Sequence, residues 1–378
     1  MTDIYTDLMD DEKRVQYTVD RQLHPDEAIR AKQLENLEHL VLHNGFKPEE
    51  VEPEMGGFLK FKPIASVESN FYDEATGTLH VINTKGDIRY DRIRHHFGIL
   101  GRATEQKLNW DIKHFGGEQK FASARFRDLA FELVNEAYDR LDVEEFTHDG
   151  VLNVIFGPFD NFPLDEGIEV IDEIKNDFLN YRLLDMGGYF AVNFDYVFAD
   201  QAKNVIEQFC LATNNEVLGA WVNIFHYGKV GVLDSKANVG DVFVPTGFMD
   251  EKLLKDNLQT IYPINNQLLI NPKATEMLEK YVGSFHEGST LNTASILRQK
   301  RVVLEEARDL GATTIDMEWG PMASYHNHYD GVDAVRYFFA GVGSDKPLEG
   351  QTLAETKFEK RQLNNIARAF TDMIRNYF

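Results

Sequence analysis

The sequence predicts an α/β fold in which a mixed, mostly parallel sheet is flanked by helices and preceded by an α+β N-terminal domain. From residue 151 onward, short apolar runs alternate with amphipathic stretches, a pattern typical of a sheet covered on both faces. Within residues 57–84, strand-like runs follow one another around a turn at 75–77. The polar stretch 142–150 interrupts the periodicity. We therefore predict two domains, residues 1–148 and 149–378.

The N-terminal domain is predicted to begin with a long helix. His24-Pro25-Asp26 opens this helix, an apolar stripe carries it to Leu42, and Asn44-Gly45 closes it. Strands follow within 57–84, and helical spacing predicts a second helix at 122–141. No activity is indicated for this domain.

In the C-terminal domain, strands and helices are predicted to alternate. Apolar runs predict strands at 151–156, 188–194 and 218–227. Helical spacing predicts helices at 164–179, 199–213 and, at the end of the chain, 358–377.

Composition and charge exclude several classes of partner. The 378 residues include 39 basic and 62 acidic side chains, a formal charge of -23, which opposes binding to a nucleic-acid polymer. The acidic start lacks the apolar segment of a secretion signal, and no apolar run approaches the roughly 18 residues of a membrane span. The single cysteine, Cys210, lies in an apolar helical pattern typical of an inert core thiol. We expect a cytoplasmic protein that binds neither nucleic acid nor membrane.

The stretch 311–347 carries the best candidate for a site. Residues 312–317 predict a buried strand that ends at Glu318, 334–342 predict a second strand followed by Asp345, and 319–329 can form the helix between them. If the two strands run parallel in one sheet, the crossover rule places Glu318 and Asp345 at the same edge, where such sheets bind ligands.

Two carboxyl groups at one edge can take different roles. One can accept hydrogen bonds from a vicinal diol, and the other, in a drier place, can hold a proton for a leaving group. This division suits cleavage of an N-ribosyl bond. Lys346 opposes it, because an adjacent cation lowers the pKa of Asp345 unless it points elsewhere. A structural interpretation, an ion pair and a helix cap, is equally open.

Several motifs occur in the same order as in a known family. They are Gly228-Lys-Val-Gly with Val239-Gly-Asp-Val242, then Gly283 to Thr290, then Asp-Met-Glu at 316–318, and then Ser344-Asp-Lys-Pro-Leu348. The pattern resembles the nucleoside phosphorylase superfamily, and most closely the AMP nucleosidases, over residues 151–378. Four motifs in order are more specific than any one of them.

The resemblance implies a role for each matched residue. Asp345 would protonate the purine and Glu318 would hold the ribose hydroxyls. Met317 would pack on the sugar, Ser344 would support the loop of Asp345, and Gly228 would lie in the family's glycine turn. Thr290 and Leu291 would lie near the base. Met317 as ordinary core and Thr290 as part of a helix cap remain alternatives.

The chain also departs from the family pattern. Phosphorolytic members have an arginine where His226 stands, and a glycine-rich loop where this chain has Asp195-Tyr-Val-Phe-Ala199. Hydrolysis is therefore preferred over phosphorolysis. A 5′-phosphate would need cations from elsewhere, for which Arg92, Arg94 and Arg102 are candidates. Their basic run can equally be a solvated helical face.

The sequence thus predicts an N-ribosyl hydrolase that cleaves the N-glycosidic bond of a purine nucleoside or nucleotide. The alternatives are a catalytically silent purine-binding protein of the same fold and a phosphate-dependent phosphorylase. No metal or organic cofactor is expected, since His326 and His328 are two residues apart and lack a third ligand at helical spacing. By resemblance, the chain is expected to form a homo-oligomer.

Overall fold

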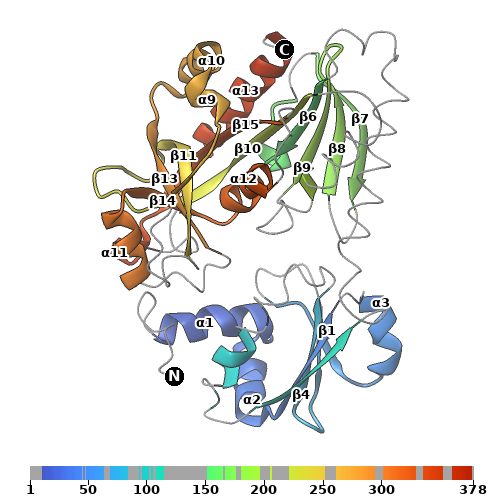
Figure 1. The fold of residues 1–378 in the computed structure, drawn as a ribbon. Helices are drawn as coiled ribbons and strands as arrows, with labels where there is room; N and C mark the ends of the chain where they lie inside the picture. Colours follow the sequence, from blue (N-terminus) through green and yellow to red (C-terminus); the bar gives the residue numbers. More distant parts are fainter. Residues whose placement is uncertain are drawn as a thin grey trace. The chain divides into compact units, whose positions relative to one another are not determined.

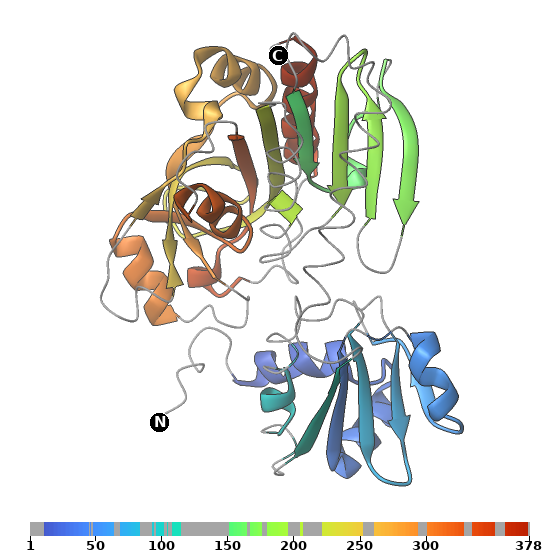
Figure 2. The same cartoon turned by 45° about the vertical axis from the view of Figure 1, so that its right-hand side comes forward.

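The computed structural model divides the chain into two compact units, Met1–Arg125 and Phe126–Phe378 (Figures 1 and 2). It describes residues 11–44, 46, 48–63, 69–83, 93, 96–101, 104, 108–114, 151–164, 167–175, 180–195, 205–206, 221–251, 261–293, 301–328, 335–351 and 360–376. The predicted boundary at 148/149 and the predicted helix 122–141 fall outside these residues and stay predictions.

The first unit is an α+β domain, and its described elements run in the following order. They are α1 (Asp11–Gln22), α2 (Glu27–Asn36), β1 (His39–Asn44), α3 (Pro48–Val51), η1 (Glu52–Glu54), β2 (Leu59–Phe61), β3 (Asn70–Asp73), β4 (Thr78–Asn83) and β5 (Asn109–His114). The strands form one sheet in the order β2-β3-β4-β1-β5, with β1 parallel to both neighbours and β2, β3 and β4 paired antiparallel.

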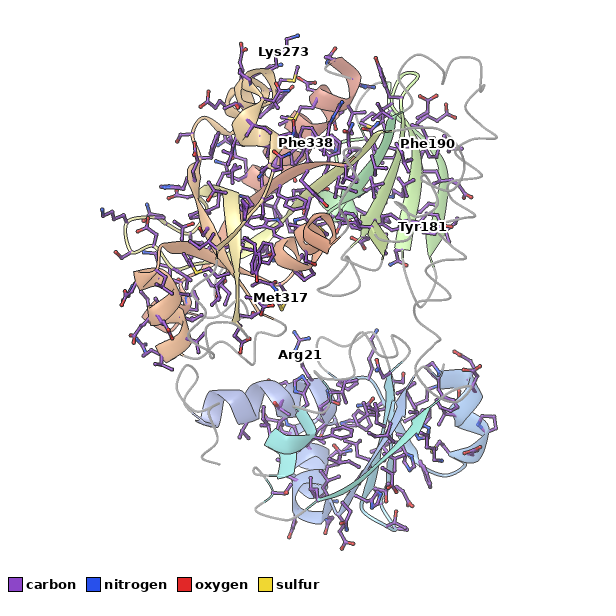
Figure 3. The ribbon with its side chains drawn as sticks, in the orientation of Figure 1. Arg21, Tyr181, Phe190, Lys273, Met317 and Phe338 are labelled. Carbon is purple, nitrogen blue, oxygen red and sulfur yellow. The ribbon has the colours of Figure 1, made fainter. Side chains whose placement is uncertain are left out.

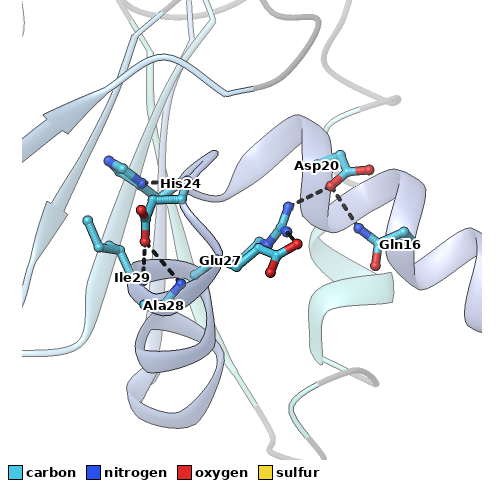
Figure 4. A network of polar contacts seen from close by, with 8 residues as sticks. Gln16, Asp20, His24, Glu27, Ala28 and Ile29 are labelled. Atoms are coloured by element: carbon cyan, nitrogen blue, oxygen red, sulfur yellow. Dashed lines mark hydrogen bonds and ion pairs between the residues drawn. The ribbon is translucent and has the colours of Figure 1, made fainter.

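Helix α2 begins where the sequence predicts. The side chain of Asp26 accepts hydrogen bonds from the backbone N–H groups of Ala28 and Ile29 at 3.0 and 3.1 Å, which satisfies donors that have no partner within the helix. Arg30 reaches back to Asp20 of α1 at 2.7 Å and ties the two helices together (Figure 4).

The predicted end of this helix at Leu42 is wrong. Helix α2 ends at Asn36, and His39–Asn44 form strand β1. Leu40 and Leu42 are fully buried on one face of the sheet while His43 points to the other, which is the period of two of a strand. The spacing of the apolar residues in 37–42 is compatible with a helix or with a strand. Parallel pairing with β4 on one side and β5 on the other stabilises the strand.

The second unit contains a ten-stranded sheet with helices. Its described elements are β6 (Val151–Phe156), η2 (Phe159–Asn161), β7 (Glu169–Lys175), β8 (Asn180–Asp185), β9 (Phe190–Asp195), β10 (Trp221–Val232), β11 (Val242–Asp250), β12 (Ile261–Pro263), α9 (Gln267–Ile270), α10 (Pro272–Val282), β13 (His286–Asn292), α11 (Arg301–Asp309), β14 (Ala312–Asp316), α12 (Trp319–His328), β15 (Val335–Asp345), η4 (Pro347–Glu349) and α13 (Arg361–Asn376).

The sheet is mixed, and the expectation that it is mostly parallel is not confirmed. Its order is β12-β11-β13-β14-β10-β6-β9-β8-β7, with β15 paired to β10 and β11. Among the described strands, five pairings are parallel and five are antiparallel. The parallel group β9-β6-β10-β15 forms its centre, and its strands point their carboxyl ends toward one edge.

The predicted helix 164–179 is wrong, because Glu169–Lys175 form the edge strand β7. This strand pairs antiparallel with β8, and Glu173 forms an ion pair with Arg182 across the pair at 2.5 Å. Its apolar residues Val170 and Ile174 are four apart, a spacing that imitates a helix turn. An edge strand with one neighbour tolerates this polar composition.

Helices α12 and α13 cover opposite faces of the central strands. Phe225 packs against Phe370 of α13 with ring centroids 5.1 Å apart, whereas the next residue, His226, contacts Trp319 of α12. Successive residues of a strand point to opposite faces. The predicted C-terminal helix is confirmed as α13, and its buried face closes the core of this unit. Among the described residues, no helix is long and apolar enough to cross a membrane.

Candidate functional site

Asp345 ends β15 as a buried carboxyl group, only 8% exposed. The Oγ atom of Ser344 lies 2.6 Å from Oδ1 of Asp345 and 3.2 Å from the carbonyl oxygen of Val230. A serine hydroxyl has a single proton and cannot donate to both acceptors. The hydroxyl therefore donates either to the carboxyl group of Asp345 or to the carbonyl of Val230.

Burial dominates the electrostatics of Asp345. Burial raises the pKa of Asp345 above its ordinary value, while the hydrogen bond from Ser344 and the charge of Lys229 act in the opposite direction. The net shift of the pKa is upward, because the cost of removing a carboxylate from water is larger than the stabilisation from these two contacts. A carboxyl group in this state can donate a proton at a pH where a surface aspartate cannot.

The cation that acts on Asp345 is Lys229, a residue that the sequence analysis did not single out. Burial, followed by the nearby charge of Lys360, lowers the pKa of Lys229, and Asp345 raises it. Lys346, the neighbour expected to oppose an acid role, instead forms an ion pair with Glu349 at 2.9 Å. The position of Lys229 directly after Gly228 was the signal that could have found it.

Asp316 and Glu318 form a second acidic pair at the end of β14. The Oδ2 atom of Asp316 accepts the backbone N–H groups of Glu318 at 2.9 Å and Trp319 at 2.5 Å, and it thereby caps the start of α12. Burial raises the pKa of Asp316, and a side-chain hydrogen bond with Glu318 and the backbone hydrogen bonds partly offset this. The helix cap that we considered as a structural alternative is thus formed by Asp316, a residue that the sequence analysis did not single out. Glu318 lies two residues further on and is 9% exposed.

The two acidic sites are brought together by β10 and not by a parallel crossover. Strand β14 pairs antiparallel with β10 and β15 pairs parallel with it, so the predicted parallel arrangement is wrong. Gly231 of β10 nevertheless has Ile315 as its partner on one side and Asp345 on the other. Two strand spacings place these residues about 10 Å apart. A Cβ atom at Gly231 would lie 2.6 Å from Ile315, so only glycine permits this approach.

The other predicted site residues lie around this junction. Met317, labelled in Figure 3, is half-buried in the connection between β14 and α12. Thr290 and Leu291 are fully buried within β13, opposite Thr314 and Ile315 of β14. In the described part of the chain, the hydroxyl of Thr290 has no hydrogen-bond partner.

His226, in the position of the family's arginine, is a buried neutral side chain. Its Nδ1 atom lies 2.8 Å from Nε1 of Trp319, and burial lowers its pKa to about 3. It therefore supplies no positive charge at neutral pH. Gly228, two residues further on, lies next to the same imidazole ring.

Asp195 occupies the carboxyl end of β9, at the edge where the parallel strands end. Its Oδ1 atom accepts the backbone N–H of Phe159 at 3.2 Å, and burial raises its pKa. The ring of Phe159 lies under the guanidinium of Arg182 at 4.1 Å. The carboxylate of Asp195 therefore binds a backbone N–H group at the edge of the sheet where the parallel strands end.

Some of the predicted residues cannot be placed. Arg92, Arg94, Arg102 and Cys210 lie outside the described residues, as do the side chains of His326 and His328. Within the part of the chain that the structure describes, no three His, Cys, Asp or Glu side chains could together hold a metal ion.

Comparisons with known proteins give one family match and low-scoring similarities to solved structures. A family of unknown function (DUF6909) matches residues 169–333, less than half of the chain, and no curated protein matches the sequence. Among solved structures, the chain is similar to the 5′-methylthioadenosine/S-adenosyl homocysteine nucleosidase of Helicobacter pylori, at 13% identity and a TM-score of 0.45, over 60% of this chain and 99% of that one.

Two further solved structures are similar to a comparable degree. The corresponding nucleosidase of Campylobacter jejuni is 15% identical, with a TM-score of 0.44 over 59% of this chain and 98% of that one. Isoform 2 of the purine nucleoside phosphorylase of Schistosoma mansoni is 12% identical, with a TM-score of 0.44 over 67% of this chain and 97% of that one. At such scores the activity must be inferred from the residues of the site.

Proposed function

We propose that residues 149–378 form an N-ribosyl hydrolase that cleaves the N-glycosidic bond of a purine nucleoside or nucleotide. The observation that carries the proposal is Asp345, a buried carboxyl group with a raised pKa. The hydroxyl of Ser344 lies 2.6 Å from its Oδ1 atom. A second buried acid, Glu318, follows β14, whose Ile315 pairs with Gly231 on the side opposite to Asp345.

In the proposed reaction the two acids act at opposite ends of the nucleoside. Asp345 donates its proton to a ring nitrogen of the purine as the electrons of the breaking C–N bond move onto the base. Glu318 accepts hydrogen bonds from the ribose hydroxyls, and its negative charge stabilises the positive charge that develops on the sugar. Water adds to the anomeric carbon and loses a proton to solvent, so the products are free base and ribose or its 5′-phosphate.

The remaining matched residues would complete the pocket. Met317, half-buried beside Glu318, would pack on the sugar, and Thr290 with Leu291 would border the base. The 5′ substituent stays open, since Arg92, Arg94 and Arg102 are the proposed contacts of a phosphate and cannot be placed. AMP is therefore one candidate among several purine substrates.

Two observations favour water over phosphate as the nucleophile. His226 is neutral at physiological pH because burial lowers its pKa to about 3, and it cannot offer the charge of an arginine. Asp195 accepts the N–H of Phe159 at the edge where the parallel strands end, which leaves a negative group where an anion would be repelled.

The test is chromatographic detection of free base from AMP, adenosine, inosine and guanosine, each with and without phosphate. We expect base to be released without phosphate, and Asp345→Asn to abolish most of the release. Asp309→Asn is the matched control, because Asp309 lies on the exposed side of α11 and its side chain is 69% exposed. Release that requires phosphate would establish a phosphorylase instead and contradict the proposal.

A purine-binding protein without turnover is the second candidate. The contact between Asp195 and Phe159 favours it, because the chain fills with its own carboxylate a position that a reactant could use. This candidate predicts that purine nucleosides raise the melting temperature while no base appears. The proposed homo-oligomer is tested separately, by light scattering of the full chain.

A further inference from the structure

His226 on β10 is a buried polar side chain that makes a hydrogen bond with Trp319. The indole Nε1 of Trp319 can only donate a hydrogen bond, and it lies 2.8 Å from Nδ1 of His226. Nδ1 must therefore be the unprotonated acceptor. Because burial keeps the ring neutral, its one proton lies on Nε2.

Trp319 is held in place from three sides, so this tautomer is imposed by the fold. Its backbone N–H is bound by Oδ2 of Asp316 at 2.5 Å. Its ring is parallel to that of Phe339, at an interplanar angle of 4° and a centroid distance of 6.5 Å. A Cβ atom at Gly341 would lie only 3.0 Å from the indole, so the ring lies flat against the backbone of β15. The ring of His226 is perpendicular to both aromatic rings.

The protonated nitrogen of His226 lies beside Gly228. A Cβ atom added to Gly228 would lie 3.1 Å from Cε1 and 3.7 Å from Nε2 of the imidazole. Gly228 belongs to the stretch of β10 that leads to Gly231, the partner of both Ile315 and Asp345. His226 is 7% exposed although Trp319 covers its other nitrogen.

We propose that Trp319 is a positioning residue that holds His226 as the Nε2–H tautomer, and that this neutral N–H donates to an uncharged oxygen of the reacting system beside Gly228. The second half rests on the proposed function, in which the oxygen belongs to a ribose hydroxyl or to the attacking water. A neutral donor orients such an oxygen without attracting a phosphate dianion.

The tautomer is tested first, without reference to activity, by nitrogen NMR of the imidazole rings in the full chain. His226 is assigned by the signal that disappears in His226→Gln. We expect a protonated Nε2 and an unprotonated Nδ1 between pH 5.5 and 8. In Trp319→Phe, which keeps the aromatic packing and loses the N–H, both tautomers should appear. A protonated Nδ1 in the wild type, or an unchanged spectrum in Trp319→Phe, would overturn the proposal.

The donor role is tested with two amide variants of His226. The amide of Gln places a donor near the position of Nε2, whereas that of Asn lies near Nδ1. We expect His226→Gln to keep kcat/KM within about threefold and His226→Asn to lose about tenfold, the worth of one hydrogen bond. Trp319→Phe should lose a similar factor, mainly in kcat. Equal losses in the Gln and Asn variants would refute the donor role.

Deoxynucleosides distinguish the two oxygen sources. If a ribose hydroxyl accepts the bond, the difference between the Gln and Asn variants vanishes for 2′- or 3′-deoxyadenosine, and if water accepts it, the difference persists. Should the wild type release no base, the same comparison is made on adenosine affinity by calorimetry. Equal affinities would then refute the donor role, while the NMR result would still decide the tautomer.

Discussion

The replacement of Asp345 by asparagine tests the centre of the proposed mechanism. Asparagine has nearly the same shape and can still accept a hydrogen bond from Ser344, which lies 2.6 Å from the carboxyl. It cannot donate a proton to the purine. The change therefore removes the acid and leaves the surroundings of the site in place.

The expected loss follows from what a general acid contributes. Positioned proton donors accelerate reactions by roughly 10² to 10⁴, which corresponds to about 3 to 5 kcal/mol of transition-state stabilisation. Because Asp345 is 8% exposed, water has little access to replace it. We expect kcat to fall by this factor while KM changes little.

The pH profile gives an independent readout. The active form of Asp345 is protonated, and burial raises its pKa, so wild-type activity should fall as the pH rises through that raised pKa. The residual activity of Asp345→Asn should lack this limb. A variant within threefold of wild type, or wild-type activity that increases with pH over this range, would refute the acid role.

The Asp345→Asn variant should lose activity without losing stability. The folded state binds the Asp345 proton more tightly than the unfolded chain does, so the stability that this group contributes is present at low pH and is lost as the pH rises through the folded pKa. Asparagine carries no charge to desolvate. In urea unfolding above that pKa, Asp345→Asn should be at least as stable as the wild type, and a large destabilisation would indicate a structural role.

Two further predictions concern the fold. Gly231→Ala places a Cβ atom 2.6 Å from Ile315, and overpacking should lower the free energy of unfolding by roughly 1 to 3 kcal/mol, measured in urea. The control Gly98→Ala places a Cβ atom that meets nothing within 4 Å and should not lower it. Equal effects of the two variants would contradict the close approach at Gly231. The second prediction concerns two histidines of the first unit, in which Nε2 of His43 lies 3.0 Å from Nδ1 of His80. The pKa of each is lowered to about 4, mainly by burial. Stability is therefore present above pH 6.5 and is lost as the pH falls toward 4, and His80→Phe should flatten this dependence; an unchanged slope would show that the pair is not responsible.

Local sequence signals were reliable where one period dominates. The strand 151–156 and the C-terminal helix each carry one unambiguous pattern, and both are present. A helix at 319–329 was predicted from the length of the connection between two strands, and α12 lies there. Where the apolar spacing is compatible with both a helix and a strand, the structure of the segment depends on whether other strands pair with it. Residues 37–42 and 169–175 were both taken for helix for this reason, and both are drawn into strands by their neighbours.

The sequence alone determined which chemical groups are available: two carboxyl groups at the ends of predicted strands, a glycine at position 228, and His226 at a position where phosphorolytic members of the superfamily that the sequence resembles have an arginine. The tertiary structure decided what those groups can do. It set Gly231 between Ile315 and Asp345, turned Lys346 toward Glu349, and made Asp316 the cap of α12. The physical reason is that burial and hydrogen-bond partners control the protonation of a side chain. Some of these partners come from segments far along the chain, as in the contact between Ser344 and Val230, which are 114 residues apart.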